Sequence, residues 1–390
     1  MTRAVFLAHT AAPSGAELAT LRLLSALRDR PGAPFEVELL VTEDGPMVER
    51  VRARGIPVTV QRNTFDSRSM TIADSGAGGL LAGGVALLKL GWTLGGVLRE
   101  RRADVLVAES TKALLMGAVA AGRARIPLVW QVHDLVSREY FGRVLAVVVR
   151  LLGWLLARGV IANSRATLGS LFTWRRAAVV AYPGVEPVTA PDDDRAPQRA
   201  PRDTVVAVVG RLCPWKGQDV LLRALAAARH RPRTVYIVGG TFFGEESYRD
   251  ELVALSDELA LPVEFVGHVE DPTAYMRAAD IFVHCSVLAE PFGQVVVEGM
   301  QAGCAVIAAR AGGPLEIIRP GVDGFLVDGG DAAALARILD QLIADPELRT
   351  RLAGSARIRA REFGIDATAA AVAEVLTAVT AGSARRSAVS

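Results

Sequence analysis

Short β-rich apolar segments alternate with helical segments along most of this 390-residue chain. The segment 4–8 is almost wholly apolar, and within 17–28 a leucine recurs at every third position, which places the leucines on one face of a helix. Strands that are separated by helices pair in parallel, because each helix carries the chain back across the sheet. The alternation therefore predicts an α/β fold built on parallel sheets.

The alternation occurs twice. In the first half we expect strands at 4–8, 37–41, 58–60, 105–108, 128–131 and 160–162, with helices at 17–28 and 48–54. In the second half we expect strands at 205–209, 234–238, 263–266, 281–285 and 305–308, with helices at 220–229, 247–259, 273–278, 295–302 and 366–381.

A segment with five prolines and an acidic run, PGVEPVTAPDDDRAPQRAPRD, separates the two series. Proline-rich polar segments of this kind are typical of linkers between domains. We predict a first domain at 1–183, a linker at 184–203 and a second domain at 204–365. Residues 366–390 are expected to form a helix that packs back across the domains, followed by a frayed tail.

Composition supports two soluble cores. Hydrophobic residues make up 51% of the chain and charged residues 22%, so neither domain is predicted to be disordered. The formal net charge of +2, from 44 basic and 42 acidic residues, is too balanced to indicate a nucleic-acid partner.

The three cysteines, Cys213, Cys285 and Cys304, form no CxxC pair and no zinc-type spacing. They favour a reducing compartment, and the first residues are too weakly apolar for a signal peptide. We therefore predict a cytoplasmic protein. Two apolar stretches, 76–98 and 144–156, are too interrupted to span a bilayer. They are either buried helices or a surface that rests on the inner face of a membrane.

The strongest local signal is GRLCPWKGQD, which directly follows the strand predicted at 205–209. Gly210 permits a tight turn, and Arg211 and Lys216 stand in the loop before a helix. Two cations beside a helix N-terminus can bind a diphosphate. The alternative is a solvated loop whose cations pair with nearby acids.

A second signal is EPFGQVVVEGMQAG, in which Glu290 and Glu298 are separated by seven residues. Glu290 precedes a helix N-terminus whose free amides belong to Phe292, Gly293 and Gln294. Carboxylates accept hydrogen bonds from sugar hydroxyls, so Glu290 could hold a sugar and Glu298 a ribose. Two glutamates on a helix are also common without any such role.

Two further sites follow predicted strands in the first half. SGAELATL opens a helix at Gly15 and Ala16, where backbone amides could approach a phosphate. It lacks the GxGxxG fingerprint, which disfavours NAD. His133 and Asp134 follow the strand at 128–131, and the histidine could contact a sugar or transfer a proton. The alternatives are an ordinary loop and a histidine bonded to backbone.

In this order and at strand ends, these segments resemble glycosyltransferase family 4, whose members have the GT-B fold of two Rossmann-like domains that face each other across a cleft. The resemblance covers essentially the whole chain and is strongest over 205–328. Its most specific elements are GRLCPWKGQD, EPFGQVVVEGMQAG and the run AGGPLEII…GVDGFLV. The first loop reads SGAE where GGAE is common in the family, and 64–100 matches no pattern that identifies the acceptor.

The resemblance implies a role for each matched residue. Arg211 and Lys216 would bind the donor diphosphate, and Glu290, with the amides of Phe292 and Gly293, would hold the transferred sugar. Glu298 would hold the ribose, Gly15 would approach the diphosphate, and His133 would contact the donor sugar. The implied activity is a retaining, metal-independent hexosyltransferase that needs no cofactor besides a UDP- or GDP-sugar donor.

The sequence does not identify the acceptor, which could be a glycan, a lipid-linked sugar or a soluble small molecule. It does not indicate the oligomeric state either. A nucleotide-sugar epimerase of the same architecture and a non-catalytic nucleotide-sugar-binding protein are the rival interpretations. The glycosyltransferase, epimerase and binding-protein interpretations all require the loop at 211–216 and the segment at 290–298 to line one pocket.

Overall fold

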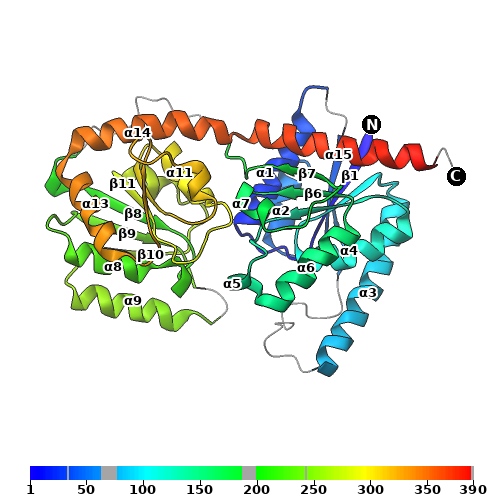
Figure 1. Ribbon diagram of the computed structural model, residues 1–390, viewed down its shortest axis with the longest axis horizontal. Helices are drawn as coiled ribbons and strands as arrows, with labels where there is room; N and C mark the ends of the chain where they lie inside the picture. The colour runs from blue at the N-terminus through cyan, green and yellow to red at the C-terminus, as the bar shows by residue number, and fades with distance from the viewer. Residues whose placement is uncertain (33–34, 63–76, 187–198, 242–243, 388–390) are drawn as a thin grey trace. The chain divides into compact units, whose positions relative to one another are not determined.

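The computed structural model describes residues 1–390 except 33–34, 63–76, 187–198, 242–243 and 388–390. The chain forms two compact units (Figure 1). The N-terminal unit comprises Met1–Gly184 together with Ile365–Ser390, and the C-terminal unit comprises Val185–Gly364. Most of the predicted linker lies outside the described residues.

The N-terminal unit holds a seven-stranded parallel sheet in the order β3-β2-β1-β4-β5-β6-β7. Its strands are β1 (Thr2–Ala8), β2 (Phe35–Val41), β3 (Val58–Val60), β4 (Val105–Ala108), β5 (Leu128–Val132), β6 (Gly159–Ala162) and β7 (Ala177–Val180). Its helices are α1 (Gly15–Asp29), α2 (Pro46–Ala53), α3 (Ala77–Glu100), α4 (Thr111–Ala124), α5 (Arg138–Phe141), α6 (Arg143–Leu156), α7 (Arg165–Gly169) and α15 (Ile365–Ser387).

The C-terminal unit holds a six-stranded parallel sheet in the order β10-β9-β8-β11-β12-β13. Its strands are β8 (Val205–Val209), β9 (Thr234–Val238), β10 (Val263–Gly267), β11 (Ile281–His284), β12 (Ala305–Ala309) and β13 (Phe325–Val327). Its helices are α8 (Gln218–Ala227), α9 (Glu246–Glu258), α10 (Thr273–Ala278), α11 (Gln294–Gln301), α12 (Pro314–Ile317), α13 (Ala332–Ala344) and α14 (Pro346–Ala360), with short 3₁₀ turns at Pro201–Asp203, Pro214–Lys216 and Arg361–Phe363.

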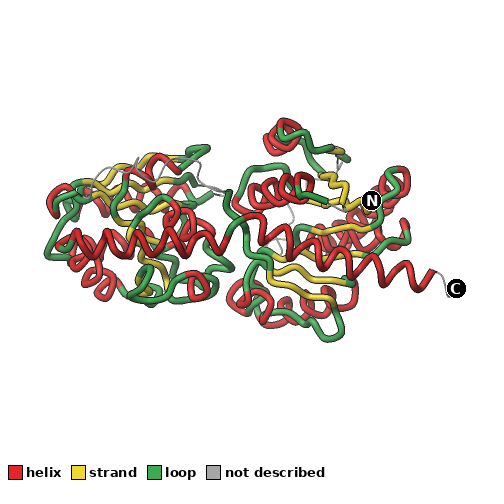
Figure 2. The backbone as a smooth tube through the Cα atoms, turned by 90° about the horizontal axis from the view of Figure 1, so that it is seen from above, coloured by secondary structure: helices red, strands yellow, loops and turns green. Residues whose placement is uncertain are grey.

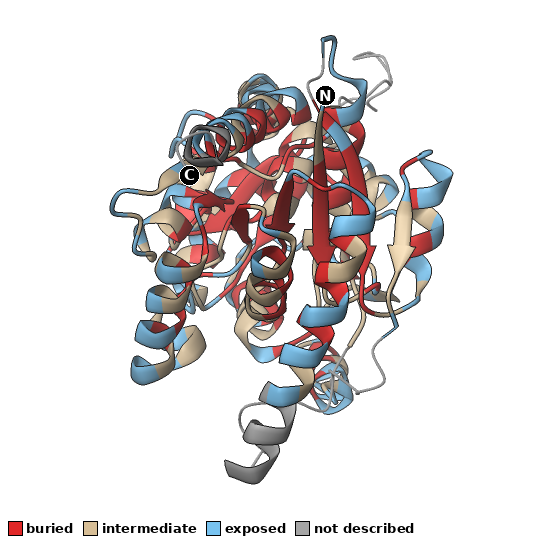
Figure 3. Ribbon diagram, turned by 90° about the vertical axis from the view of Figure 1, so that its right-hand side faces the viewer, coloured by how far each residue is buried: buried red, intermediate tan, exposed pale blue. Residues whose placement is uncertain are grey.

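These topologies confirm the predicted α/β class with two Rossmann-like sheets. Within each unit, helices cover both faces of the sheet (Figure 2). The central strands are consequently buried on both sides, as Figure 3 shows for the N-terminal unit, whereas β3, β7 and β10 are only partly buried. In β1, Phe6 packs into the core on one face of the sheet and Leu7 into the core on the other. A strand buried on both faces reads as a continuous apolar run, which is why 4–8 is recognisable in the sequence.

Both apolar stretches of the first half are half-buried helices. In α3, Leu94 and Leu98 are buried while Trp92 is 59% exposed. In α6, Ala146 and Val149 are buried, whereas the opposite face exposes apolar side chains. Two strands, β7 and β13, four and three residues long, were not predicted from the sequence.

Among the residues that the structure describes, one helix is long and apolar enough to cross a membrane, through its segment Ile365–Gly382. This segment belongs to α15, which packs against α1, β6 and β7 of the N-terminal unit. Val372 and Leu376 are fully buried there as part of a core cluster. By these contacts α15 serves as a helix of the N-terminal core.

Candidate functional site

The loops of interest in the C-terminal unit meet where its sheet changes direction. The chain crosses from β8 to β9 on one side and from β10 to β11 on the other, so β8 and β11 are adjacent while their connections diverge. In an open parallel sheet, ligands bind outside the carboxyl ends of the strands at such a switch point. Arg211 and Lys216 follow β8, and Glu290 follows β11.

A four-residue polar network occupies this edge. The Lys216 ammonium donates to Glu290 Oε2 at 2.7 Å. His284 Nε2 lies 3.2 Å from the same oxygen, and the Ser286 hydroxyl donates to it at 3.1 Å. His284 Nδ1 accepts from the Ala309 backbone amide at 3.4 Å, so Nε2 carries the proton and donates to Glu290.

The charge of Glu290 is fixed by these partners. Burial of the carboxyl would raise its pKa, but the Lys216 ammonium and the His284 hydrogen bond outweigh burial and hold the pKa well below the ordinary range. The Lys216 and Glu290 side chains are only 16% and 14% exposed. The site therefore holds a buried ion pair whose cation lies beside the phosphate-binding loop expected from the sequence.

Backbone packing positions Glu290. Gly312, with φ +72°, pairs with Glu290 in a parallel bridge, and a Cβ there would lie 2.0 Å from the Glu290 carbonyl oxygen. The Gly313 amide donates to the same oxygen at 2.8 Å. Only glycine allows this approach, so the GG pair in AGGPLEII is needed to hold Glu290 in place.

Arg211 lies on the same loop as Lys216. Its Nε is 3.3 Å from Glu245 Oε2, so the cation pairs with an acid in the absence of ligand. The ring of Trp215 lies between the two cations, with Lys216 Nζ 4.3 Å and Arg211 Cζ 6.0 Å from its centroid. Gly210, at φ +155°, carries the chain out of β8 against Gly239.

The second glutamate, Glu298, lies in α11, one turn after Gln294. Glu298 accepts a hydrogen bond from the Gln294 side chain at 2.6 Å, which turns both side chains along one face of the helix. Gly293 caps the helix with φ +91°. Phe292 is buried, and its ring packs against Phe363 with centroids 5.9 Å apart. The predicted contribution of Phe292 is thus confined to its backbone.

The N-terminal unit brings a second glutamate and histidine together. His133 Nε2 lies 3.1 Å from Glu109 Oε2, and the Thr20 hydroxyl donates to that oxygen at 2.6 Å. The partner of His133 is thus a carboxylate and not the backbone. Burial lowers the pKa of His133, but the hydrogen bond and charge of Glu109 more than reverse this, and the pKa is raised.

Gly15 begins α1, and Ala16 follows in its first turn. A Cβ built on Gly15 would meet no atom of the chain within 4 Å. Its neighbourhood therefore contrasts with that of Gly312, where the protein itself requires glycine. Space beside a helix N-terminus suits an anionic ligand.

Sequence reasoning missed His284, Ser286 and Glu109. His284 lies within a buried strand, where a polar residue is a signal in itself because buried polar groups need partners. Glu109 directly follows β4 and thus occupies the same kind of position as Arg211. A further unused signal is that only three of the 44 basic residues are lysines, so Lys216 stands out in an arginine-rich chain.

Comparisons with known proteins match both units. The family model "Glycosyl transferases group 1" matches residues 190–359, and the model "Glycosyl transferase 4-like domain" matches residues 14–184. The D-inositol 3-phosphate glycosyltransferase of Streptomyces scabiei (strain 87.22) is 34% identical over 297 residues. That alignment covers 67% of this chain and 65% of the relative, so the chain spans just under two thirds of the relative's length.

Among solved structures, Anabaena Alr3699/HepE in complex with UDP and glucose superposes with a TM-score of 0.80 at 31% identity, covering 97% of this chain and all of that one. The complex of the same protein with UDP-glucose has a TM-score of 0.79 at 30% identity, with the same coverage.

Proposed function

Because the chain belongs to glycosyltransferase family 4 and has the GT-B fold, we propose that it transfers a hexose-type sugar from UDP-sugar to an acceptor hydroxyl. The observation that carries the proposal is the Lys216–Glu290 ion pair at the switch point of the C-terminal sheet. It places a cation for a diphosphate directly beside a carboxylate for sugar hydroxyls. The UDP-glucose bound to HepE favours uridine over guanosine as the donor base.

In the proposed reaction, the bond between the sugar and the diphosphate breaks and a bond to the acceptor oxygen forms on the same face of the sugar. Arg211 and Lys216 neutralise the charge that develops on the leaving UDP. An oxygen of that diphosphate takes the proton from the acceptor hydroxyl. Attack on the face that the diphosphate leaves retains the anomeric configuration, and because two protein cations supply the positive charge, the proposed transfer is independent of metal.

The other site residues have binding roles in this proposal. Glu290, held by His284 and Ser286, accepts hydrogen bonds from the sugar, together with the amides of Phe292 and Gly293. Glu298 and Gln294 bind the ribose. From the N-terminal unit, Gly15 and Ala16 approach the diphosphate, and His133 contacts the donor sugar.

Thermal shift with nucleotides tests the donor site. A ligand that binds only the folded chain raises its Tm by mass action. We expect UDP and UDP-glucose to raise the Tm more than GDP and GDP-mannose, and the Lys216→Ala variant to lose the shift. A larger shift with GDP would contradict the proposed base. The anomeric configuration of the product, read by NMR, tests retention.

Incubation of the enzyme with donor alone separates the rival activities. A transferase releases UDP at a rate that depends on added acceptor. An epimerase would isomerise the donor sugar without acceptor, and a binding protein would raise Tm without any turnover. Activity that survives EDTA would support metal independence, and activity restored only by a divalent cation would contradict it.

A second observation supports contact with the inner face of the cytoplasmic membrane. The outward face of α6 exposes Val144, Val147, Leu151 and Leu155, at helical spacing. Arg143 begins the helix and Arg138 precedes it, both exposed, and no acid lies in the first turn. An apolar face flanked by arginines fits an anionic lipid surface.

From the sequence, Trp92, Trp154 and nearby arginines were expected to face a membrane. The Trp154 indole N–H donates to the Trp174 carbonyl at 3.0 Å, which holds this ring within the fold. Trp92 and Trp174 are 59% and 67% exposed. A membrane-facing acceptor such as a lipid-linked sugar is the corresponding proposal, and a soluble acceptor is the alternative.

Co-sedimentation with anionic vesicles at low salt tests the membrane contact. We expect the protein to sediment with the vesicles and Leu151→Glu to remove most of the binding. Ile358→Glu is the matched control, because Ile358 is an exposed isoleucine on α14 of the other unit. Equal sedimentation of the Leu151 variant and the wild type would contradict the role of α6.

A further inference from the structure

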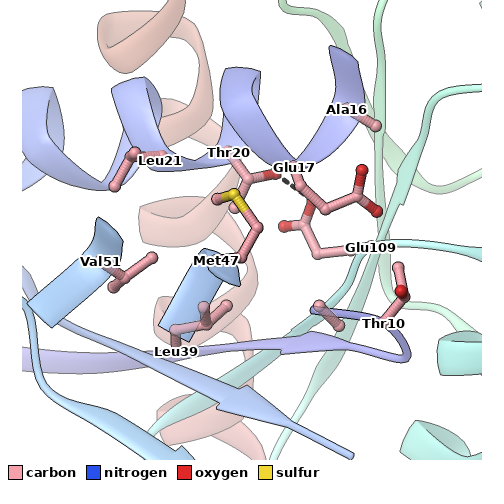
Figure 4. Close-up of a pocket in the computed structure, with 10 residues that line it drawn as sticks. Thr10, Ala16, Glu17, Thr20, Leu21, Leu39, Met47, Val51 and Glu109 are labelled. Carbon is pink, nitrogen blue, oxygen red and sulfur yellow. Dashed lines mark hydrogen bonds between the residues drawn. The ribbon is translucent and has the colours of Figure 1, made fainter. Parts of the chain in front are cut away.

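A small hollow, partly open to solvent, lies at the switch point of the N-terminal sheet (Figure 4). The switch point is the pair β1 and β4, whose connections diverge. Ala8 ends β1, and Glu109 follows β4; Leu39 of β2, Thr10 and residues of α1 and α2 supply the remaining walls. The hollow thus occupies in the N-terminal sheet the position that the Lys216–Glu290 network occupies in the other sheet.

Glu109 lines this hollow and carries a buried oxygen without a hydrogen-bond partner among the described residues. Its side chain is only 8% exposed. Oε2 accepts from Thr20 and lies within hydrogen-bond distance of His133, whereas Oε1 has no hydrogen-bond partner among the described residues. Buried oxygens without a partner are rare in folded proteins because the lost hydration is not replaced. A ligand that donates a hydrogen bond would satisfy it.

The charges around the hollow are negative. Glu17 is the second carboxylate in its wall (Figure 4). None of the described residues that line the hollow is lysine or arginine. Thr10 and Thr20 are the other polar side chains, and Leu39 and Met47 form an apolar floor. Lys112 lies close enough to His9, which follows β1, to lower its pKa.

We propose that this hollow binds a hydrogen-bond-donating, non-anionic group of the acceptor, a hydroxyl or an ammonium group, and disfavours a phosphate. The proposal rests on the glycosyl transfer proposed above, with the donor held by the other unit. A phosphate would face two carboxylates without a lining cation, whereas the donor diphosphate has Arg211 and Lys216. The acceptor would therefore differ in charge from the inositol 3-phosphate in the name of the Streptomyces relative.

Glucose, glucosamine and glucose 6-phosphate test this preference, because they differ mainly in charge. Each is titrated against the UDP-bound protein, with binding followed by ligand-observed NMR. We expect glucose and glucosamine to bind and glucose 6-phosphate to bind at least tenfold more weakly. Glu109→Gln, which replaces one acceptor oxygen by an NH₂ group, should weaken both preferred ligands about tenfold, since a hydrogen bond to a charged group is lost.

Glu38→Gln is the matched control. Glu38 is also a buried glutamate of the N-terminal unit, but its carboxylate bonds to Thr59 within the fold. Stronger binding of the phosphorylated sugar, no binding of any of the three, or equal effects of the Glu109 and Glu38 variants would each overturn the proposal. UDP affinity, measured in every variant, separates this result from the proposed function: loss of the preference with UDP binding intact leaves the transferase proposal standing.

Discussion

The two switch points of the molecule each contain a glutamate and a histidine, but the two pairs suit ligands of different charge. Each places a buried glutamate beside a histidine at the carboxyl edge of a parallel sheet. In the C-terminal unit, Glu290 also contacts the Lys216 ammonium. Lys216 and His284 both bond to the same carboxylate oxygen, Oε2. In the N-terminal unit, Glu109 contacts His133 and Thr20 but no lysine or arginine among the described residues.

The difference teaches that charge, and not topology, distinguishes the two sites. Both sheets have the same strand order around their switch points, so the fold offers two equivalent positions for a ligand. The loop after β8 brings Arg211 and Lys216, which suit a diphosphate. The loop after β4 brings Glu109, which suits a donor of hydrogen bonds.

The largest effect should follow from removing the cation of the C-terminal site. We expect Lys216→Ala to reduce kcat by roughly 10²–10³-fold, the usual result of losing one preorganised group that stabilises developing negative charge. Lys89→Ala, at an exposed position of α3, should leave kcat unchanged. Steady-state kinetics of UDP release measures both. A Lys216 variant with near-normal kcat would remove the basis for assigning the diphosphate to this unit.

Glycines provide the second contrast between the units. At Gly313, a Cβ would lie 2.2 Å from the Phe292 carbonyl oxygen, so Gly313→Ala should destabilise the protein by about 1–3 kcal/mol. At Gly15 nothing lies within 4 Å, so Gly15→Ala should leave stability unchanged but raise the KM for donor about tenfold, if phosphate approaches there.

Denaturant unfolding and donor kinetics measure these two effects. Gly354→Ala, in the exposed middle of α14 with open space around it, is the control and should stabilise the helix by about 1 kcal/mol. An unchanged donor KM in the Gly15 variant would show that α1 does not approach the diphosphate.

A smaller effect concerns His9, which follows β1 in the N-terminal unit. Burial, and secondly the charge of Lys112, lower its pKa to about 4. The unfolded chain binds this proton below about pH 6.5, so stability is unaffected above that pH and falls as the pH drops toward 4. At pH 5 the loss is about 1 kcal/mol after allowance for solvent screening of a ring that is only partly buried.

The comparison of stability at pH 7 and pH 5 checks this prediction. His9→Gln should lose less stability on acidification than the wild type, whereas His268→Gln, at an exposed position of the C-terminal unit, should behave as the wild type. Equal pH dependence of the wild type and the His9 variant would show that His9 is protonated as readily in the folded chain.

The sequence was most informative where the chain is regular. Strands such as 205–209 and 234–238 were predicted with their observed bounds, because parallel strands buried on both faces are continuous apolar runs. The cationic and acidic loops were also predictable, since they follow those strands. The three-residue strand β13 was missed although β3, which is equally short, was predicted, because so few residues carry little pattern.

The partners of the predicted residues were not predictable. Nothing in the sequence spacing indicates that Lys216 contacts Glu290 across 74 positions, or that His284 donates to the same oxygen. These contacts follow from the adjacency of β8 and β11, which is a property of the strand order. The same holds for Glu109 and His133, which meet because β4 and β5 are neighbours.

The smallest predicted effect tests the coupling of that last pair. Glu109 raises the pKa of His133 above its ordinary value, against the opposing effect of burial. The pair therefore contributes its full stabilisation of the fold below pH 6.5, and this stabilisation is lost as the pH rises through the folded-state pKa of His133. NMR titration of the His133 ring should show a midpoint above 6.5, and Glu109→Gln should lower it. A His133 midpoint that is unchanged in the Glu109→Gln variant would mean that the N-terminal glutamate and histidine are not coupled. The comparison between the two switch points would then rest on Glu290 alone.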